Sequence, residues 1–220
     1  ESKLTAQQFF DPTNFNLLNE VSNTTPTFFG DGDILVNVVN FGVKWNIIRR
    51  LISNNCRVRL LPWSSKFSNF LDADAWVLSN GPGDPAISSE LIKQVRFLVE
   101  KKSSVLGICL GHQLLSLAVG AKTERLHYGH RSHNQPVRQL DTMKGFITSQ
   151  NHGFVVVKNS LSGEWNVWFE NINDNSIEGI KHKTLPLRSV QFHPEASSGP
   201  KDTSFIIDDF CSEVRALKKG

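Results

Sequence analysis

The sequence has no long apolar stretch and no strong excess of charge of either sign. No run approaches the roughly 20 apolar residues of a membrane-spanning helix, and the start, ESKLTAQQFF, lacks the basic and apolar regions of a signal peptide. The formal net charge is only +3, and the lysines and arginines are spread without a run that could follow a phosphate backbone. These absences argue against a membrane protein and against a nucleic-acid partner, and they predict a soluble cytoplasmic protein.

Cysteine is scarce as well. The 3 cysteines, Cys56, Cys109 and Cys211, lie far apart and form no CxxC pair, which argues against a disulfide framework and a thiolate zinc site. Cys56 and Cys211 fall within apolar or helical patterns, so we expect them to be inert packing residues. The sequence also lacks a GxxxxGK[ST] loop, so no nucleotide site is predicted in this chain.

The length bounds the number of domains. The 220 residues suffice for one α/β domain with an appendage, but not for two full domains of usual size. Residues 1–32 show little periodicity and contain turn-prone stretches, so we interpret them as a linker or as the tail of an upstream lobe. We expect residues 33–220 to form the domain.

Short β-branched runs alternate with helical periodicity from residue 34 onward. We expect strands at 34–39, 58–61, 75–79 and 105–108, and helices within 45–55, 88–101 and 112–118. This alternation predicts an α/β fold in which an open, mostly parallel sheet carries helices on both faces. Later strand-like pieces, at 146–149, 154–157, 165–169, 177–180 and 187–192, predict antiparallel strands added at one side, before a final helix at 203–217.

The sharpest local feature is the stretch VLGICLGHQ at residues 105–113, where an apolar strand meets a helix at Cys109. It has the G-x-nucleophile-x-G pattern of a nucleophile elbow. Glycines at 107 and 111 permit the tight turn, because a side chain at either place would collide with neighbouring backbone. The helix N-terminus favours a thiolate at Cys109, and the Leu110 N–H can donate to an oxyanion. The alternative is a buried structural cysteine, the usual fate of a free thiol in a core.

A histidine suited to proton transfer at neutral pH follows a late strand, in the run VQFHPE at residues 190–195. Because strand ends gather at one edge of an α/β sheet, His193 and Cys109 can meet there. Glu195 is placed to accept a hydrogen bond from the other ring nitrogen and to hold the tautomer. The alternative is a turn with a solvated glutamate.

A rigid turn closes the apolar strand at 75–79. The run SNGPGDP at residues 79–85 holds two glycines and two prolines, and its backbone N–H groups can face a ligand. Gly83 is the candidate for a second oxyanion donor. A plain surface turn is the alternative.

Together, GICLGHQ (107–113), SNGPGDP (79–85), SQNHGF (149–154) and QFHPEASSGP (191–200) resemble the triad-type, class I glutamine amidotransferases. More narrowly, roughly residues 34–212 resemble the glutaminase subunit of carbamoyl phosphate synthetase. The runs FGVKWN (41–46), GAKT (120–123) and YGHRSHNQPV (128–137) favour this branch over the relatives that serve anthranilate or GMP synthesis.

The resemblance implies a flavodoxin-like class I amidotransferase fold and a Cys-His-Glu triad. In that triad Cys109 is the nucleophile, His193 the general acid and base, and Glu195 its orienting carboxylate. Backbone oxyanion donors are implied at Gly83 and Leu110. The residues implied to hold the α-amino and α-carboxylate ends of glutamine are Gly81, Gln113, Asn151, Gly153 and Phe154.

The implied reaction is hydrolysis of glutamine to glutamate and ammonia. The ammonia would pass to the large synthetase subunit, or to fused synthetase domains, for carbamoyl phosphate synthesis in the arginine and pyrimidine pathways. No cofactor is implied for this chain, and ATP and Mg²⁺ are expected on the synthetase partner. Two alternatives stay open: an amidotransferase of the same fold that serves another synthase, and a catalytically silent interaction subunit.

Two features depart from the family pattern. Asn40 stands where the family usually has an aspartate, which removes a charge near the edge of the site. Residues 1–32 resemble only the connecting tail of the family's amino-terminal lobe, so we expect that lobe, and a glutamine contact from it, to be missing. His127, His130 and His133 recur at intervals of three in a non-helical segment, where this spacing has no fixed geometry, and we expect no metal site there.

Overall fold

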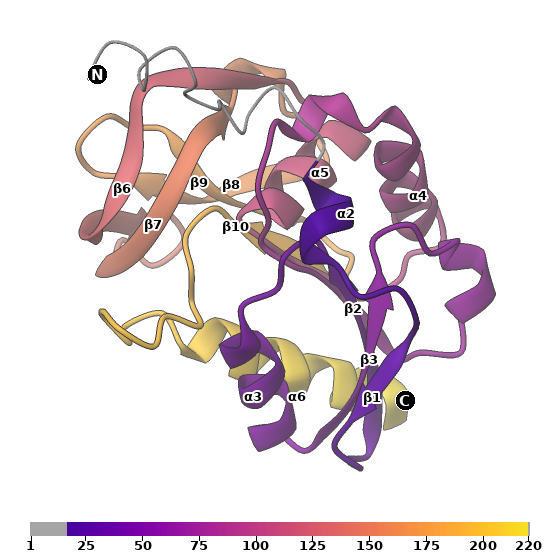
Figure 1. Ribbon diagram of the computed structural model, residues 1–220. Coiled ribbons are helices and arrows are strands. Elements are labelled where there is room, and N and C mark those ends of the chain that lie inside the picture. The colour runs from indigo at the N-terminus through magenta and orange to yellow at the C-terminus, as the bar shows by residue number, and fades with distance from the viewer. Residues whose placement is uncertain (1–16, 220) are drawn as a thin grey trace, which may run out of the picture.

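The computed structural model describes residues 17–219, which form a ten-stranded sheet with helices around it (Figure 1). Runs of buried aliphatic residues form the middle of this sheet. The helices are α2 (Leu18–Val21), α3 (Trp45–Ser53), α4 (Ser89–Glu100), α5 (Leu110–Ala118) and α6 (Phe205–Lys219). The strands are β1 (Thr27–Phe29), β2 (Ile34–Asn40), β3 (Cys56–Pro62), β4 (Ala75–Leu78), β5 (Val105–Ile108), β6 (Thr123–Gln139), β7 (Gly145–Val156), β8 (Trp165–Asn171), β9 (Ile177–His182) and β10 (Leu187–Val190). Short 3-10 helices lie at Phe67–Phe70, Pro85–Ile87 and Lys158–Ser160.

Five of the described strands run parallel, in the order β3-β2-β4-β5-β10. Strand β10 returns from late in the chain to lie beside β5, and its last residue, Val190, stands opposite Ile108 at the end of β5. The carboxyl ends of these two strands therefore meet at one edge, where the residues that follow them come together.

The other part of the sheet is antiparallel and closes on itself. Strands β9, β7, β6 and β8 continue the order beyond β10, and β8 also pairs with β9. The α/β class and the added antiparallel strands are confirmed, but the sheet closes in this part, so the expectation of an open sheet is wrong here. Register shifts in β6, between Arg125 and His130 and between Ser132 and Gln135, bend this long strand, so that it follows β7 and then meets β8.

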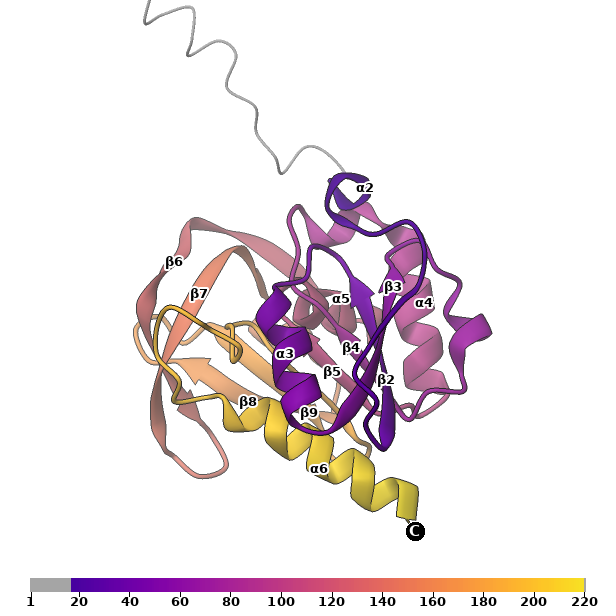
Figure 2. The same ribbon diagram turned by 60° about the horizontal axis from the view of Figure 1, so that its bottom comes forward.

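Helices cover both faces of the parallel strands (Figure 2). On one face, Val36 of β2 packs in a cluster with side chains of α3 and α6, such as Ile47 and Phe210. On the other face, Trp76 of β4 packs in a cluster with side chains of α4 and α5, such as Leu98. The strands are therefore buried on both sides, as continuous apolar runs predict, and the expectation of helices on both faces is confirmed.

The segment ahead of β2 contributes an edge strand, because β1 pairs antiparallel with β3. The interpretation of residues 1–32 as a linker stays a prediction, and residues 1–16 of it lie outside the described part of the chain. Between residues 17 and 219, no helix combines the length and apolar character needed to cross a bilayer. Cys56 and Cys211 are free and buried, with their Sγ atoms 3.5 Å apart, which agrees with a packing role.

Candidate active site

Cys109 occupies the tight turn between β5 and α5. Its φ of 54° and ψ of −103° lie in a region that residues with side chains rarely adopt. Its N–H donates to the Val190 carbonyl at 2.9 Å, which ties the turn to the end of β10. As the N-cap residue of α5, Cys109 lies at the positive end of the helix dipole, where a thiolate is favoured.

The two glycines that flank this turn have no room for a side chain. A Cβ at Gly107 would lie 2.6 Å from the Gly111 carbonyl oxygen, and a Cβ at Gly111 would lie 2.1 Å from the Leu78 carbonyl oxygen. The backbones of β4, β5 and α5 are thus in direct contact, which confirms the steric reason predicted for both glycines. The Gly111 N–H also donates to the Ser79 carbonyl at 3.1 Å and joins the elbow to the loop after β4.

His193 and Glu195 follow β10, the strand next to β5. His193 Nδ1 lies 2.8 Å from Glu195 Oε1, and the two side chains are only 3% and 0% exposed. Asn46 Nδ2 donates to the Glu195 carbonyl, and Lys44 Nζ lies 3.7 Å from Oε1. The alternative of a turn with a solvated glutamate is therefore wrong. With Nδ1–H directed to Glu195, the ring has Nε2 left to interact with Cys109.

Neighbouring charges favour an imidazolium at His193. Burial alone would lower the pKa of His193, but the charge of Cys109, a hydrogen bond with that cysteine and the Glu195 carboxylate raise it to about 9. Burial would raise the pKa of Glu195, but the His193 imidazole and the Lys44 charge outweigh burial and lower it. A positive imidazole between a thiol and a carboxylate is the charge arrangement that activates a cysteine.

The thiol opens onto a cavity of about 440 Å³. The predicted site residues that line it are Gly81, Gly83, Cys109, Gln113, Asn151, Gly153, Phe154 and His193. Leu110 lines a neighbouring pocket with its side chain, and its amide is the first of α5, a position with no partner inside the helix. Glu195 lies behind His193. The structure therefore brings the residues predicted from four separate motifs to one place.

The loop after β4 forms one wall of this cavity. A Cβ at Gly81 would lie 2.2 Å from the carbonyl oxygen that follows β2, and Gly83 has a φ of 95°. The Asn80 side chain accepts from Lys44 N at 3.0 Å and donates to the Gly42 carbonyl at 2.9 Å. These bonds fix the loop against the segment that precedes α3.

Gln113 connects α5 to a second wall of the cavity, formed by β7. Its Nε2 donates to the Phe154 carbonyl at 3.0 Å and to Gln191 Oε1 at 2.9 Å. Because Nε2 is engaged within the protein, Oε1 is the atom that Gln113 can offer to a ligand.

Several cavity residues were not singled out from the sequence. They are Val21, Gly42, Lys44, Asn80, Pro82, Arg125, Arg131 and His152. His152 stands inside the run SQNHGF, so the motif itself was the available signal. Arg125 and Arg131 belong to β6, a strand that the sequence pattern does not predict.

Asn40 lies beside the cavity and not in its lining. Its Oδ1 accepts from Gly42 N at 3.0 Å and Val43 N at 2.9 Å, while its Nδ2 donates to Asn23 Oδ1 at 3.0 Å. An aspartate could accept the same two backbone bonds, but it could not donate to Asn23. The amide of Asn40 therefore fits its turn without an uncompensated polar group.

The three histidines of β6 face different partners. His127 packs edge-on against Tyr128, and His133 Nδ1 lies 2.8 Å from Ser149 Oγ. His130 instead lies between two carboxylates contributed by the segment from β8 to β9. Their regular spacing in the sequence therefore does not bring the three rings to one point.

An α/β sheet that presents a cysteine at a strand–helix elbow, beside a buried histidine–carboxylate pair, is an arrangement typical of triad hydrolases with a cysteine nucleophile. Comparison with known families agrees, since the family Glutamine amidotransferase class-I matches residues 37–212. The chain belongs to the class-I glutamine amidotransferase family.

Curated relatives include small chains of carbamoyl phosphate synthase. The chain is 51% identical over 174 residues to the carbamoyl phosphate synthase small chain of Methanocaldococcus jannaschii, a match that covers 78% of this chain and 49% of that protein. It is 41% identical over 218 residues to the arginine-specific small chain of Schizosaccharomyces pombe, covering 97% and 52%. It is 44% identical over 213 residues to the multifunctional protein CAD of Squalus acanthias, covering 96% and 10%. The chain thus spans about half the length of the small chains it matches.

Two solved structures share the fold. One is a putative GMP synthase component from Thermoplasma acidophilum, with a TM-score of 0.72 at 20% identity, covering 85% of this chain and 98% of that one. The other is a glutamine amidotransferase from Thermotoga maritima, with a TM-score of 0.63 at 18% identity, covering 84% and 85%. At this identity the likeness concerns the fold alone.

Proposed function

We propose that this chain hydrolyses glutamine to glutamate and ammonia, with Cys109 as the nucleophile, His193 as the general acid and base, and Glu195 as the orienting carboxylate. The observation that carries the proposal is the buried His193–Glu195 pair, 2.8 Å apart, beside a thiol that opens onto the cavity. A neighbouring imidazole is the group that can take the thiol proton and so generate the thiolate, which is the nucleophilic species.

In the proposed reaction, the thiolate attacks the side-chain amide carbon of glutamine, and the carbonyl oxygen becomes an oxyanion. The backbone N–H groups of Gly83 and Leu110 are the proposed donors to this oxyanion. The C–N bond then breaks while His193 gives its proton to the departing ammonia, and a γ-glutamyl thioester forms on Cys109. His193 next takes a proton from the water that attacks the thioester, and release of glutamate restores the thiolate.

The far end of glutamine carries an ammonium and a carboxylate, which need acceptors and donors. The residues proposed to hold this end are Gly81, Gln113, Asn151, Gly153 and Phe154, all of which line the cavity. A Cβ at Gly153 would lie 3.3 Å from the Arg131 guanidinium, so glycine keeps this wall open to a ligand. The proposed chemistry needs no cofactor or metal from this chain.

We propose a carbamoyl phosphate synthetase large subunit, or fused synthetase domains, as the acceptor of the ammonia. The names of the relatives support this partner, two being small chains of carbamoyl phosphate synthase. Ammonia released into water would mostly become protonated and lose its nucleophilicity, so a sheltered path to a partner is needed. ATP and Mg²⁺ would bind to that partner, and the proposed setting is the cytoplasmic synthesis of arginine or pyrimidines.

Glutamate release from glutamine, measured with the wild-type chain beside Cys109→Ala, tests the proposal. We expect release by the wild type only, and a higher rate with carbamoyl phosphate formation when a large subunit, ATP and bicarbonate are added. Equal background in both proteins, with and without that subunit, would contradict glutaminase activity. Hydrolysis that a different synthase stimulates, and this large subunit does not, would keep the chemistry and reject the partner.

A further inference from the structure

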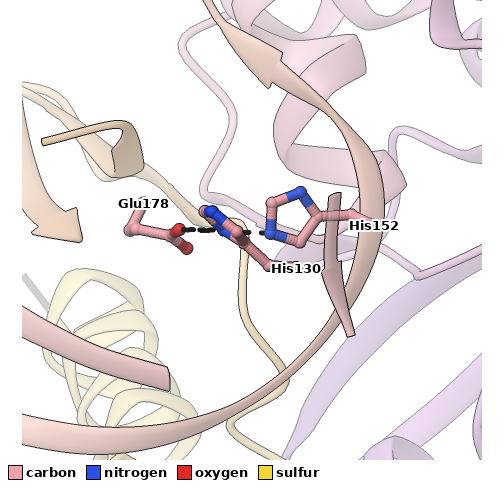
Figure 3. A group of neighbouring side chains, drawn as sticks. All are labelled: His130, His152 and Glu178. Carbon is pink, nitrogen blue, oxygen red and sulfur yellow. Dashed lines mark hydrogen bonds and ion pairs between the residues drawn. The ribbon is translucent and has the colours of Figure 1, made fainter. Parts of the chain in front are cut away.

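A buried group of titratable side chains lies along the wall that β7 contributes to the cavity. His130 of β6, His152 of β7 and Glu178 of β9 come together there, as Figure 3 shows. His130 Nδ1 lies 3.2 Å from Glu178 Oε1, and His130 Nε2 lies 2.8 Å from Asp174 Oδ2. Both ring nitrogens of His130 therefore face a carboxylate, and an imidazole can donate to both only when it carries two protons.

Glu178 is the more deeply buried of the two carboxylates that face His130. Its side chain is fully buried, and its Oε1 also accepts from Asn171 Nδ2 at 3.3 Å, while its Oε2 has no hydrogen-bond partner among the described residues. Burial raises the pKa of Glu178, and the His130 imidazole opposes that shift. In turn, the hydrogen bond to Glu178 and, to a smaller extent, the contact with Asp174 raise the pKa of His130 to about 9. The two groups thus stabilise each other's charged forms.

The ion pair reaches the cavity through His152. The His130 and His152 rings pack edge to face with centroids 4.9 Å apart, and His152 Nε2 lies 3.0 Å from Gln150 Oε1 and 4.0 Å from Glu178 Oε1. Burial lowers the pKa of His152 to about 3, and the positive charge of His130 contributes to this shift. His152 is therefore neutral at physiological pH. A neutral ring can donate through Nδ1–H to the Phe154 carbonyl, which lies 2.9 Å away.

The Phe154 carbonyl is where two walls of the cavity meet. It accepts from His152 Nδ1 on β7 and from Gln113 Nε2 on α5, at 2.9 and 3.0 Å. Gln113, His152 and Phe154 all line the cavity, and α5 begins directly after Cys109. A displaced His152 ring would leave the Phe154 carbonyl joined to Gln113 but without the bond that fixes it within β7.

We propose that Glu178, paired with His130, is a positioning residue for substrate binding, which acts by fixing the His152 ring and with it the β7 wall of the cavity. The inference rests on the proposed glutaminase function. It makes Glu178 a determinant of glutamine affinity, although Glu178 itself does not line the cavity. The same three side chains offer ligand atoms within 4.8 Å of one another, a spacing that a zinc ion could also use, so metal content is part of the test.

The test compares the wild-type chain with Glu178→Gln, which keeps the shape of the side chain and removes its charge. We expect the KM for glutamine to rise about tenfold with kcat little changed, since a buried charged hydrogen bond is lost away from the reacting atoms. The matched control is Glu170→Gln, which removes the partner of Lys158 on the neighbouring strand β8 and leaves KM unchanged. Histidine side-chain NMR should show a doubly protonated His130 near neutral pH in the wild type and a singly protonated one in Glu178→Gln.

Three results would overturn the inference: an unchanged KM in Glu178→Gln, a loss confined to kcat, or a neutral His130 in the wild type. Stoichiometric zinc in the purified wild type, lost in Glu178→Gln, would also overturn it and assign a metal site instead. If Glu178→Gln does not fold, Asp174→Asn at a 41% exposed side chain replaces it, with an expected KM increase of about twofold to threefold. Absence of glutaminase activity in the wild type would reject the proposed function, whereas wild-type activity with an unchanged KM in the variants rejects only this inference.

Discussion

Replacing Glu195 by glutamine tests how a buried carboxylate controls His193. The change keeps the size of the side chain and an oxygen that can accept from Nδ1–H, and it removes the negative charge. The pKa of His193 is raised from 6.5 to about 9, a difference worth roughly 3 kcal/mol. Both Cys109 and Glu195 contribute to this rise in the pKa of His193. Losing about half of the corresponding free energy would lower kcat/KM by roughly 10- to 30-fold.

The pH dependence of kcat/KM shows in which direction the loss of the Glu195 charge acts. His193 keeps its proton until the pH rises through about 9, so the imidazolium is present below that pH and lost above it. In Glu195→Gln the pKa of His193 moves back toward its ordinary value, so the alkaline limb of kcat/KM should move to lower pH.

The assay is glutamate release, with kcat/KM measured from neutral to alkaline pH for the wild type, Glu195→Gln and the control Glu164→Gln. Glu164 is exposed on the loop before β8 and should leave the profile unchanged. The titration of glutamine itself is common to all three proteins, so only the difference between the profiles is informative. Wild-type activity in Glu195→Gln, or an alkaline limb at the same pH, would refute the assigned role of Glu195.

Other predictions concern stability. Gly111→Ala should lower the free energy of unfolding in urea by about 1–3 kcal/mol, because its Cβ would meet the Leu78 carbonyl oxygen, whereas Gly163→Ala should be tolerated because a Cβ there meets no atom within 4 Å. Phe169→Ala should lower it by about 3–5 kcal/mol, because this fully buried ring packs on the rings of Phe146 and Phe192. The raised pKa of His130 stabilises the fold below pH 6.5, and this stabilisation is lost as the pH rises through about 9. The fall in Tm at alkaline pH should therefore be smaller in His130→Gln than in the wild type. An identical fall in Tm in both proteins would contradict this role of His130.

The parallel half of the fold could be predicted because its sequence is locally consistent. The apolar run of β2, the helical spacing of Ile47, Ile48 and Leu51, and the glycine pattern around Cys109 each predict one kind of structure. The return of β10 beside β5 could be inferred only from the need of His193 to reach Cys109.

The closed antiparallel part was harder to predict for a physical reason. Strand β6 is largely polar and exposed, contains Gly129 and Pro136, and is interrupted by bulges, so neither apolar alternation nor β propensity marks it. The pieces 146–149 and 154–157 are one strand, β7, whose polar middle lines the cavity and breaks the apolar pattern. Nothing in the sequence connects His130 with Glu178, because their contact depends on the closure of this part of the sheet.

The most direct test of the central claim is to trap the intermediate. Wild-type chain mixed with glutamine and quenched in acid should carry a γ-glutamyl group on the peptide that contains Cys109, detected by peptide mass mapping, and Cys109→Ala should carry none. Glutamate release by the wild type without this adduct, together with equal release by Cys109→Ala, would show that the thiol of Cys109 is not the nucleophile and would contradict the account.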